Sequence, residues 1–115
     1  SMIIIYHNNR CSKSRHCLDL LKESKSDYKI IEYLKDELST YAIKDIINKL
    51  EGNIKDVIRV NEKEIKGLKV DLENKDAIVD MISMYKICLQ RPIIYVNKKY
   101  VICRPPEKVL QFIKK

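Results

Sequence analysis

A single cysteine, Cys11, lies in the polar stretch YHNNRCSKSR, between two apolar segments. Residues 2–6 before it predict a buried strand, and the apolar stripe after it predicts a helix over residues 12–25. The free N–H groups and the dipole at a helix start lower the pKa of a thiol from about 8.5 to roughly 3.5–7.5, which produces a nucleophilic thiolate. The same N–H groups bind anions. The turn therefore predicts a reactive thiol beside an oxyanion site.

Cationic and hydroxyl side chains surround this thiol, and they favour both the thiolate and a bound anion. They are His7, Arg10, Ser12, Ser14 and Arg15. A packing role suits Cys17 better, because Cys17 shares an apolar stripe with Leu21. Zinc is the competing interpretation of the His and Cys residues, since His7, Cys11, His16 and Cys17 are close in sequence. Their spacing does not fit paired zinc ligands, because His16 and Cys17 are adjacent and point apart on a helix. We therefore expect no metal site.

Length, cysteine content and charge limit the classes of protein that the chain can represent. The 115 residues predict one domain, residues 2–115, with a helical insert at about 36–90. No signal-peptide pattern and no long apolar stretch is evident, so we expect a cytoplasmic protein without a membrane partner, whose four cysteines are reduced. The net charge of +7 comes mainly from lysines that are scattered along the chain, and few aromatic residues lie between the basic ones. It predicts a solvated surface and no nucleic-acid partner.

The elements that must position Cys11 follow from hydrophobic periodicity and capping residues. The pattern predicts strands at 2–6 and 29–34. In the middle it predicts a helix that is capped by Ser39 or Thr40 and includes Leu50, short helical turns over 54–73, and a helix from about 76. At the end it predicts strands at 93–96 and 100–103 around a turn at 97–99, and then a last helix opened by residues 104–107. Strand, helix and strand at the start predict a right-handed parallel crossover. The order β-α-β, helical insert, β-β-α predicts an α/β thioredoxin-like fold with a mixed sheet.

Three separated motifs, YHNNRCSKSR, QRPIIYV and ICRPPEKVL, resemble the ArsC family of arsenate reductases that couple to glutaredoxin. The resemblance covers essentially the whole chain. It implies that Cys11 is the catalytic nucleophile that attacks arsenate. It also implies three catalytic arginines that close over the oxyanion, three substrate-binding residues and one cis-proline. The catalytic arginines would be Arg59, Arg91 and Arg104. The substrate-binding residues would be His7, Ser14 and Arg15, and the cis-proline would be Pro92.

The same resemblance implies the partners of the reaction. Glutathione would act as co-substrate and glutaredoxin as reductant, with no bound cofactor, and we expect a monomer. Asn9 replaces a proline common in the family, which bears on the substrate. Two alternatives stay open: a glutathione-dependent thiol oxidoreductase acting on another substrate, and a regulator of the related Spx family, which binds RNA polymerase. Spx proteins typically carry Cys-x-x-Cys at this turn, and here the second position is Ser14.

Overall fold

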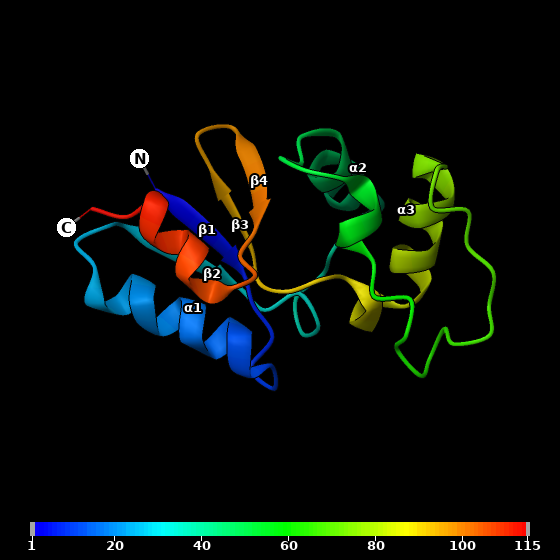
Figure 1. Cartoon of the computed structure of the whole chain (residues 1–115), viewed down its shortest axis with the longest axis horizontal. Helices are drawn as coiled ribbons and strands as arrows, with labels where there is room; N and C mark the ends of the chain where they lie inside the picture. Colours follow the sequence, from blue (N-terminus) through cyan, green and yellow to red (C-terminus); the bar gives the residue numbers. More distant parts are fainter. Residues whose placement is uncertain (1, 115) are drawn as a thin grey trace.

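The computed structural model describes residues 2–114, and its centre is a mixed sheet of four strands (Figure 1). The strands are β1 (Ile3–Tyr6), β2 (Tyr28–Ile31), β3 (Ile93–Val96) and β4 (Lys99–Ile102), in the order β2-β1-β3-β4. β1 and β2 are parallel, whereas β3 is antiparallel to both β1 and β4. The predicted thioredoxin-like α/β architecture with a mixed sheet is confirmed.

Both faces of the sheet are buried, because alternate residues of each strand point to opposite sides and most of them are apolar. Ile3 and Ile5 of β1 belong to one core, which includes Leu21 of α1 (Ser12–Glu23). Tyr6 belongs to the other core, which joins the sheet to the helices of the middle segment. The sheet is therefore a layer between two groups of helices.

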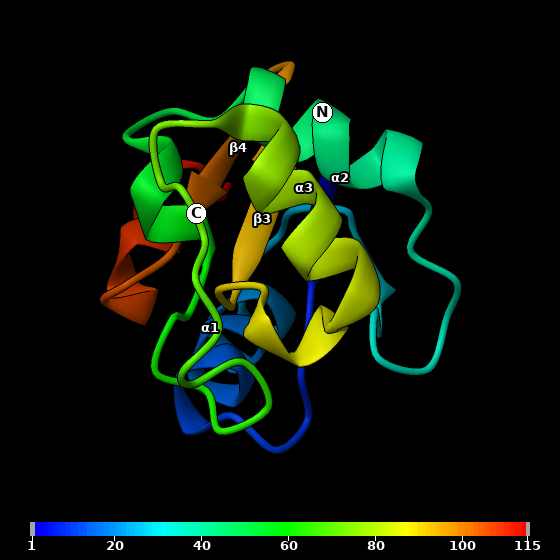
Figure 2. The same cartoon turned by 90° about the vertical axis from the view of Figure 1, so that its right-hand side faces the viewer.

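The helices divide between these two faces. α1 packs with η3 (Pro106–Gln111), a 3-10 helix, whereas α2 (Thr40–Asn48) packs with α3 (Lys75–Met84). Two short 3-10 helices, η1 (Ile54–Val57) and η2 (Lys86–Cys88), complete the middle segment. The molecule measures 43 × 26 × 24 Å, and its long axis runs from the sheet to α3 (Figure 1). Figure 2 is viewed from the α3 end and shows α3 in front of the sheet.

Within residues 2–114, no helix is long and apolar enough to cross a membrane.

Apart from one-residue shifts at strand ends, five details of the sequence-based prediction are wrong. α1 ends at Glu23, two residues before the predicted end, because Ser24 caps it with an N–H that bonds to the Leu21 carbonyl. β2 ends at Ile31, so the predicted strand 29–34 loses its last part to a turn. α2 starts after Ser39, whose hydroxyl accepts from the Ala42 N–H at 3.0 Å, but it ends at Asn48, and Leu50 bridges to Tyr100 instead.

The other two differences lie near the carboxyl end of the chain. The hairpin turn consists of Asn97 and Lys98 alone, with φ of 53° and 63°, so Lys99 already belongs to β4. The last helix is a 3-10 helix that begins at Pro106, where the missing proline N–H costs no hydrogen bond.

The parallel pairing of β1 and β2 brings their carboxyl ends to one edge of the sheet. The turn that leads to Cys11 follows β1, and the turn that contains Tyr33 follows β2. The segment before β3, which carries Arg91, reaches the same edge because β3 is antiparallel to β1. This edge gathers the residues of the candidate site.

Candidate active site

Cys11 is the N-cap residue of α1, with φ −96° and ψ 120°, and its side chain is half-buried. Partial burial alone would raise the pKa of the thiol. The Ser14 N–H, the Arg91 guanidinium and the Lys13 N–H outweigh burial, and together they lower the pKa of Cys11 below its ordinary value. The structure thus places the thiol at the start of a helix, beside a cation, where its thiolate is stabilised.

A chain of hydrogen bonds holds the turn beneath this thiol. The Asn9 amide Nδ2 donates to Glu32 at 2.8 Å, so its oxygen is left to accept from His7 Nε2 at 2.7 Å. In the neutral ring, His7 Nδ1 then accepts from the Ser14 hydroxyl at 2.6 Å, and the Ser14 oxygen accepts from the Asn8 N–H at 3.1 Å. Every polar atom of the His7 ring and of the Ser14 side chain is therefore used within the protein.

The three predicted substrate-binding residues, His7, Ser14 and Arg15, serve the turn itself in this structure. His7 and Ser14 are buried, and Ser14 faces the Cys11 sulfur with its backbone N–H rather than its hydroxyl. Arg15 is exposed, and its Nη1 donates to the Asn9 carbonyl at 2.8 Å. Contact of these side chains with an oxyanion stays a prediction. In the structure, their side chains bond within the turn that carries the thiol.

Arg91 is the arginine that acts directly on the thiol. Its side chain is only 11% exposed, and it interacts with Cys11 both as a hydrogen-bond donor and as a charge. Its Nη1 donates to the Ile87 carbonyl at 2.9 Å and lies 3.5 Å from Glu62 Oε1. These contacts anchor the guanidinium, so its position is set before a ligand arrives.

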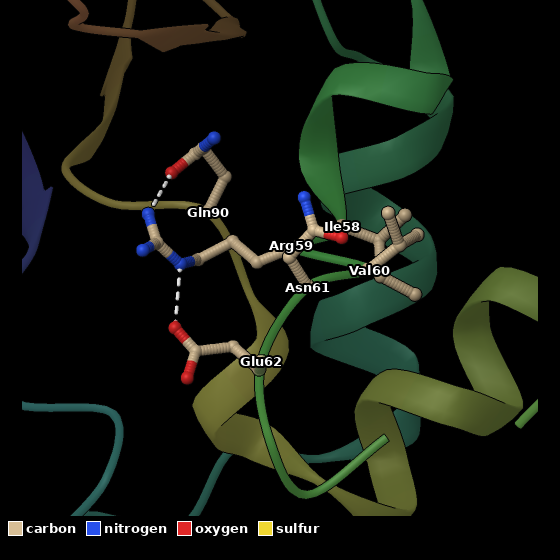
Figure 3. A pocket seen from close by; sticks show the side chains of 6 residues that line it. All are labelled: Ile58, Arg59, Val60, Asn61, Glu62 and Gln90. Carbon is tan, nitrogen blue, oxygen red and sulfur yellow. Dashed lines mark hydrogen bonds and ion pairs between the residues drawn. The ribbon is translucent and has the colours of Figure 1, made fainter. Parts of the chain in front are cut away.

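Arg59 comes from the middle segment, and its side chain extends toward Glu62 and Gln90 (Figure 3). Its Nε donates to Glu62 Oε1 at 2.9 Å, and its Nη1 donates to Gln90 Oε1 at 2.8 Å. Arg59 and Arg91 therefore share one carboxylate oxygen of Glu62. The Glu62 carboxylate lies between the two guanidinium groups and partly neutralises both, which reduces their mutual repulsion.

Arg104 contacts the segment that carries Arg91. Its Nη1 donates to the Arg91 carbonyl at 2.9 Å. The Arg91–Pro92 peptide bond is cis, and so is the Arg104–Pro105 bond. Arg59 and Arg91 thus meet at Glu62, whereas Arg104 reaches only the Arg91 backbone and its side chain lines a separate cavity beside Glu51 and Lys108. The reaction role of each stays a prediction.

Three residues of this site were absent from the sequence-based set. Glu62 lies three residues after Arg59, and this spacing is the one signal that could have suggested an ion pair. Gln90 precedes Arg91, and its side-chain oxygen also accepts from the Arg91 N–H at 3.3 Å. Tyr33 is fully buried, and Arg91 and Cys11 both influence its pKa. Nothing in the sequence pattern marks Tyr33, because it reads as one more apolar position of a strand.

The remaining cysteines are buried. Cys17 and Cys103 lie close together in the core under α1, and their mutual contact, together with burial, raises the pKa of Cys17. Burial raises the pKa of Cys88 to about 11. Among residues 2–114, no three His, Cys, Asp or Glu side chains are grouped so that they could hold a metal ion.

These differences predict an order of thiol reactivity. Iodoacetamide, which is uncharged, should alkylate Cys11 at pH 7 at least about tenfold faster than the three buried thiols, because only the accessible thiolate attacks. The rate at Cys11 should reach half its maximum at a lower pH than for an ordinary thiol, since its pKa is lowered. Timed labelling followed by mass spectrometry measures both. Equal, slow labelling of all four cysteines would contradict the assignment of Cys11 as the reactive thiol.

A groove of about 920 Å³ runs beside the thiol turn. It is bordered by the turn itself, by residues 62–64 and by Arg91, and its lining includes both signs of charge, with Glu32 and Glu64 as well as Lys35 and Lys63. A smaller cavity of about 370 Å³ lies beside Arg59 and Gln90 (Figure 3). The thiol turn is thus open to a molecule larger than a simple anion.

Comparisons with known proteins agree with this geometry. Residues 6–112 match the ArsC family. The chain is 36% identical to the arsenate reductase of Neisseria meningitidis serogroup A over 110 residues, which is 93% of this chain and 94% of the relative. It is 37% identical to the arsenate reductase of Haemophilus influenzae over 115 residues, which is 96% of this chain and 98% of the relative.

A solved structure shows the same fold. The arsenate reductase from Vibrio cholerae superimposes with a TM-score of 0.83 at 30% identity, over 96% of this chain and 97% of that structure. The similarity extends over both the sheet and the middle segment that carries Arg59.

Proposed function

The chain belongs to the ArsC family, and from this premise we propose that it reduces arsenate through a thiolate at Cys11, with glutathione and glutaredoxin as the reducing partners. Its relatives named arsenate reductase place it among the oxidoreductases. Arsenate as substrate and glutathione as reductant are the specific parts of the proposal. The observation that carries them is a thiol of lowered pKa at a helix start, in contact with Arg91.

The proposed reaction begins with attack of the Cys11 thiolate on the arsenic atom. The S–As bond forms, one As–O bond breaks, and the leaving oxygen departs as water after it takes up protons. The N–H groups of Lys13 and Ser14 and the Arg91 guanidinium all interact with the Cys11 thiol, and we expect them to face the negative charge that the oxyanion accumulates. Fixed donors at such a place lower the barrier, because they need no reorganisation when charge develops.

Reduction follows in the proposed second step. A glutathione thiol attacks the Cys11 sulfur, the S–As bond breaks, and its electron pair stays on arsenic, which leaves as arsenite. Cys11 and glutathione then share a disulfide, so two thiol sulfurs are oxidised while arsenic gains two electrons. Glutaredoxin attacks the glutathione sulfur and releases the Cys11 thiol.

The groove beside the thiol turn supports glutathione as the second reactant. Glutathione carries two carboxylates and one ammonium group, and the groove offers Lys35 and Lys63 beside Glu32 and Glu64. Its volume of about 920 Å³ accommodates a tripeptide. These features match the charge and the size of the proposed co-substrate.

A coupled assay tests the proposal. Arsenate, glutathione, glutaredoxin, glutathione reductase and NADPH are combined with the chain, and arsenite is measured together with NADPH consumption. We expect turnover only when all components are present, with one arsenite formed per NADPH. Omission of glutaredoxin alone should stop turnover after Cys11 has become glutathionylated, which intact-mass measurement detects.

Two results would contradict the proposal. Glutathionylation of Cys11 without arsenite would favour a thiol oxidoreductase that acts on another substrate. Absence of turnover together with stable binding to RNA polymerase would favour a regulator.

A further inference from the structure

Tyr33 places a hydroxyl at the site without any partner for it. The residue is 0% exposed, and its hydroxyl has no hydrogen-bond partner among residues 2–114. The Asn8 side chain lies close enough to lower the pKa of Tyr33 by donating toward its oxygen, but it does not reach hydrogen-bond geometry with the hydroxyl. Buried hydroxyls are nearly always paired, so an unpaired one at a site calls for an explanation.

A second buried donor beside it is also unpaired. Arg91 Nε has no partner in the described part of the chain, although Arg91 Nη1 bonds to Ile87 and faces Glu62. Tyr33 and Nε of Arg91 are the two unpaired buried side-chain polar atoms of residues 2–114, and both belong to residues that interact with Cys11. Two unrelated packing faults would have no reason to coincide at one thiol.

We propose that Tyr33 is a further substrate-binding residue, whose hydroxyl donates a hydrogen bond, together with Arg91 Nε, to the tetrahedral oxyanion held at Cys11. This inference rests on the proposed function, because it assigns a residue to the same anion. An oxyanion carries several acceptor oxygens, so it satisfies both donors at once. The backbone N–H groups of Lys13 and Ser14 would serve oxygens on the side of the helix.

Tyr33 contributes a donor of a different kind from the arginines. Burial raises the pKa of Tyr33 to about 12, even though Arg91, Asn8 and Arg59 lower it. The phenol therefore stays protonated near neutral pH and donates without adding charge. A neutral donor selects among anions by the position of their oxygen atoms, because its hydrogen bond is strong only when an oxygen lies in line with the O–H.

The substitution Tyr33→Phe tests this role, because it keeps the ring and removes only the hydroxyl. Binding is measured as protection of Cys11 from iodoacetamide by arsenate, phosphate and sulfate, each titrated alone in chloride buffer. We expect Tyr33→Phe to lower the affinity of the protecting anion about tenfold, which is the usual effect of losing one hydrogen bond to a charged ligand. Its melting temperature without anion should be unchanged or higher, because no partner inside the protein is lost.

Tyr100→Phe is the matched control. Tyr100 is also a buried tyrosine, but its hydroxyl donates to Asp45 Oδ2 at 2.7 Å, on the face of the sheet that packs against α2. Its removal should lower the melting temperature and leave anion affinity unchanged. The two substitutions should therefore show opposite effects on stability and binding.

Each outcome decides the inference. Equal anion affinity of Tyr33→Phe and the unmodified chain would overturn it, and so would a loss of stability like that of Tyr100→Phe, which would show that the hydroxyl is bonded within the protein. Protection by none of the three anions would overturn both this inference and the proposed function. Protection that depends on Tyr33, without arsenite formation in the coupled assay, would support the inference and contradict the proposed reaction.

Discussion

Replacing Cys11 with serine is expected to lower arsenate reduction by at least roughly a thousandfold, because a serine hydroxyl stays protonated near neutral pH and forms no disulfide. The lowered pKa of Cys11 depends on donors that would remain in place, namely the Ser14 and Lys13 N–H groups and Arg91. Anion binding should therefore persist in Cys11→Ser while chemistry stops. Arsenite formation in the coupled assay measures the loss, and equilibrium dialysis with radiolabelled phosphate measures retained binding.

The buried thiols provide the controls for this experiment. Cys88→Ala and Cys103→Ala should each retain turnover, since both thiols are 0% exposed and glutathione supplies the second sulfur. If either substitution were as damaging as Cys11→Ser, the second sulfur would come from the protein itself. The glutathione step of the mechanism would then be wrong.

Hydrophobic periodicity was sufficient to predict the fold around Cys11. The alternation of Ile3 and Ile5 against Tyr6 fits a sheet buried on both faces, and the switch from period 2 to a helical stripe after residue 11 marks the start of α1. The spacing of apolar residues was enough for this prediction, because the periods of strands and helices are visible among residues that are neighbours in sequence. Element ends were less predictable, as the early end of β2 shows.

The end of β2 also explains why Tyr33 was missed. Its neighbours in sequence fit a strand, so the residue read as a core position, and the structure does bury it completely. The role that we propose for it depends on the turn after β2, which begins beside the carboxyl end of β1. That placement depends on pairing between segments far apart in the chain, which no local pattern records.

The arginines illustrate the same limit from another direction. Arginine chemistry suggested oxyanion binding, and the family resemblance selected which arginines to consider. Only the fold shows that Arg59 and Arg91 share one oxygen of Glu62, or that Arg104 bonds to the Arg91 backbone. The Glu62 carboxylate therefore competes with a bound anion, because an anion that enters between Arg59 and Arg91 must replace the contacts of Glu62 with both guanidinium groups.

Arg91→Ala is expected to lower turnover about a hundredfold, since loss of one fixed donor to a developing oxyanion costs on the order of 3 kcal/mol. Arg91 is the arginine that interacts with Cys11 itself, so the same substitution should also raise the pH at which Cys11 alkylation is half-maximal. Arg91→Lys keeps the charge and loses the planar fork, and we expect it to restore the pH midpoint more than the turnover. Steady-state kinetics and the pH profile of alkylation separate the two effects.

Arg59 and Arg10 set the scale for this result. Arg59 is held by Glu62 and Gln90 and affects the thiol less directly, so Arg59→Ala should mainly weaken substrate binding and raise KM. Arg10 lies in the same turn as Cys11, is exposed and lines the groove. Arg10→Ala should therefore leave turnover at saturating glutathione within about twofold of the unmodified chain, as expected for an exposed charge. If Arg10→Ala were as damaging as Arg91→Ala, positive charge near the thiol would suffice, and the fixed geometry of Arg91 would have no part in catalysis.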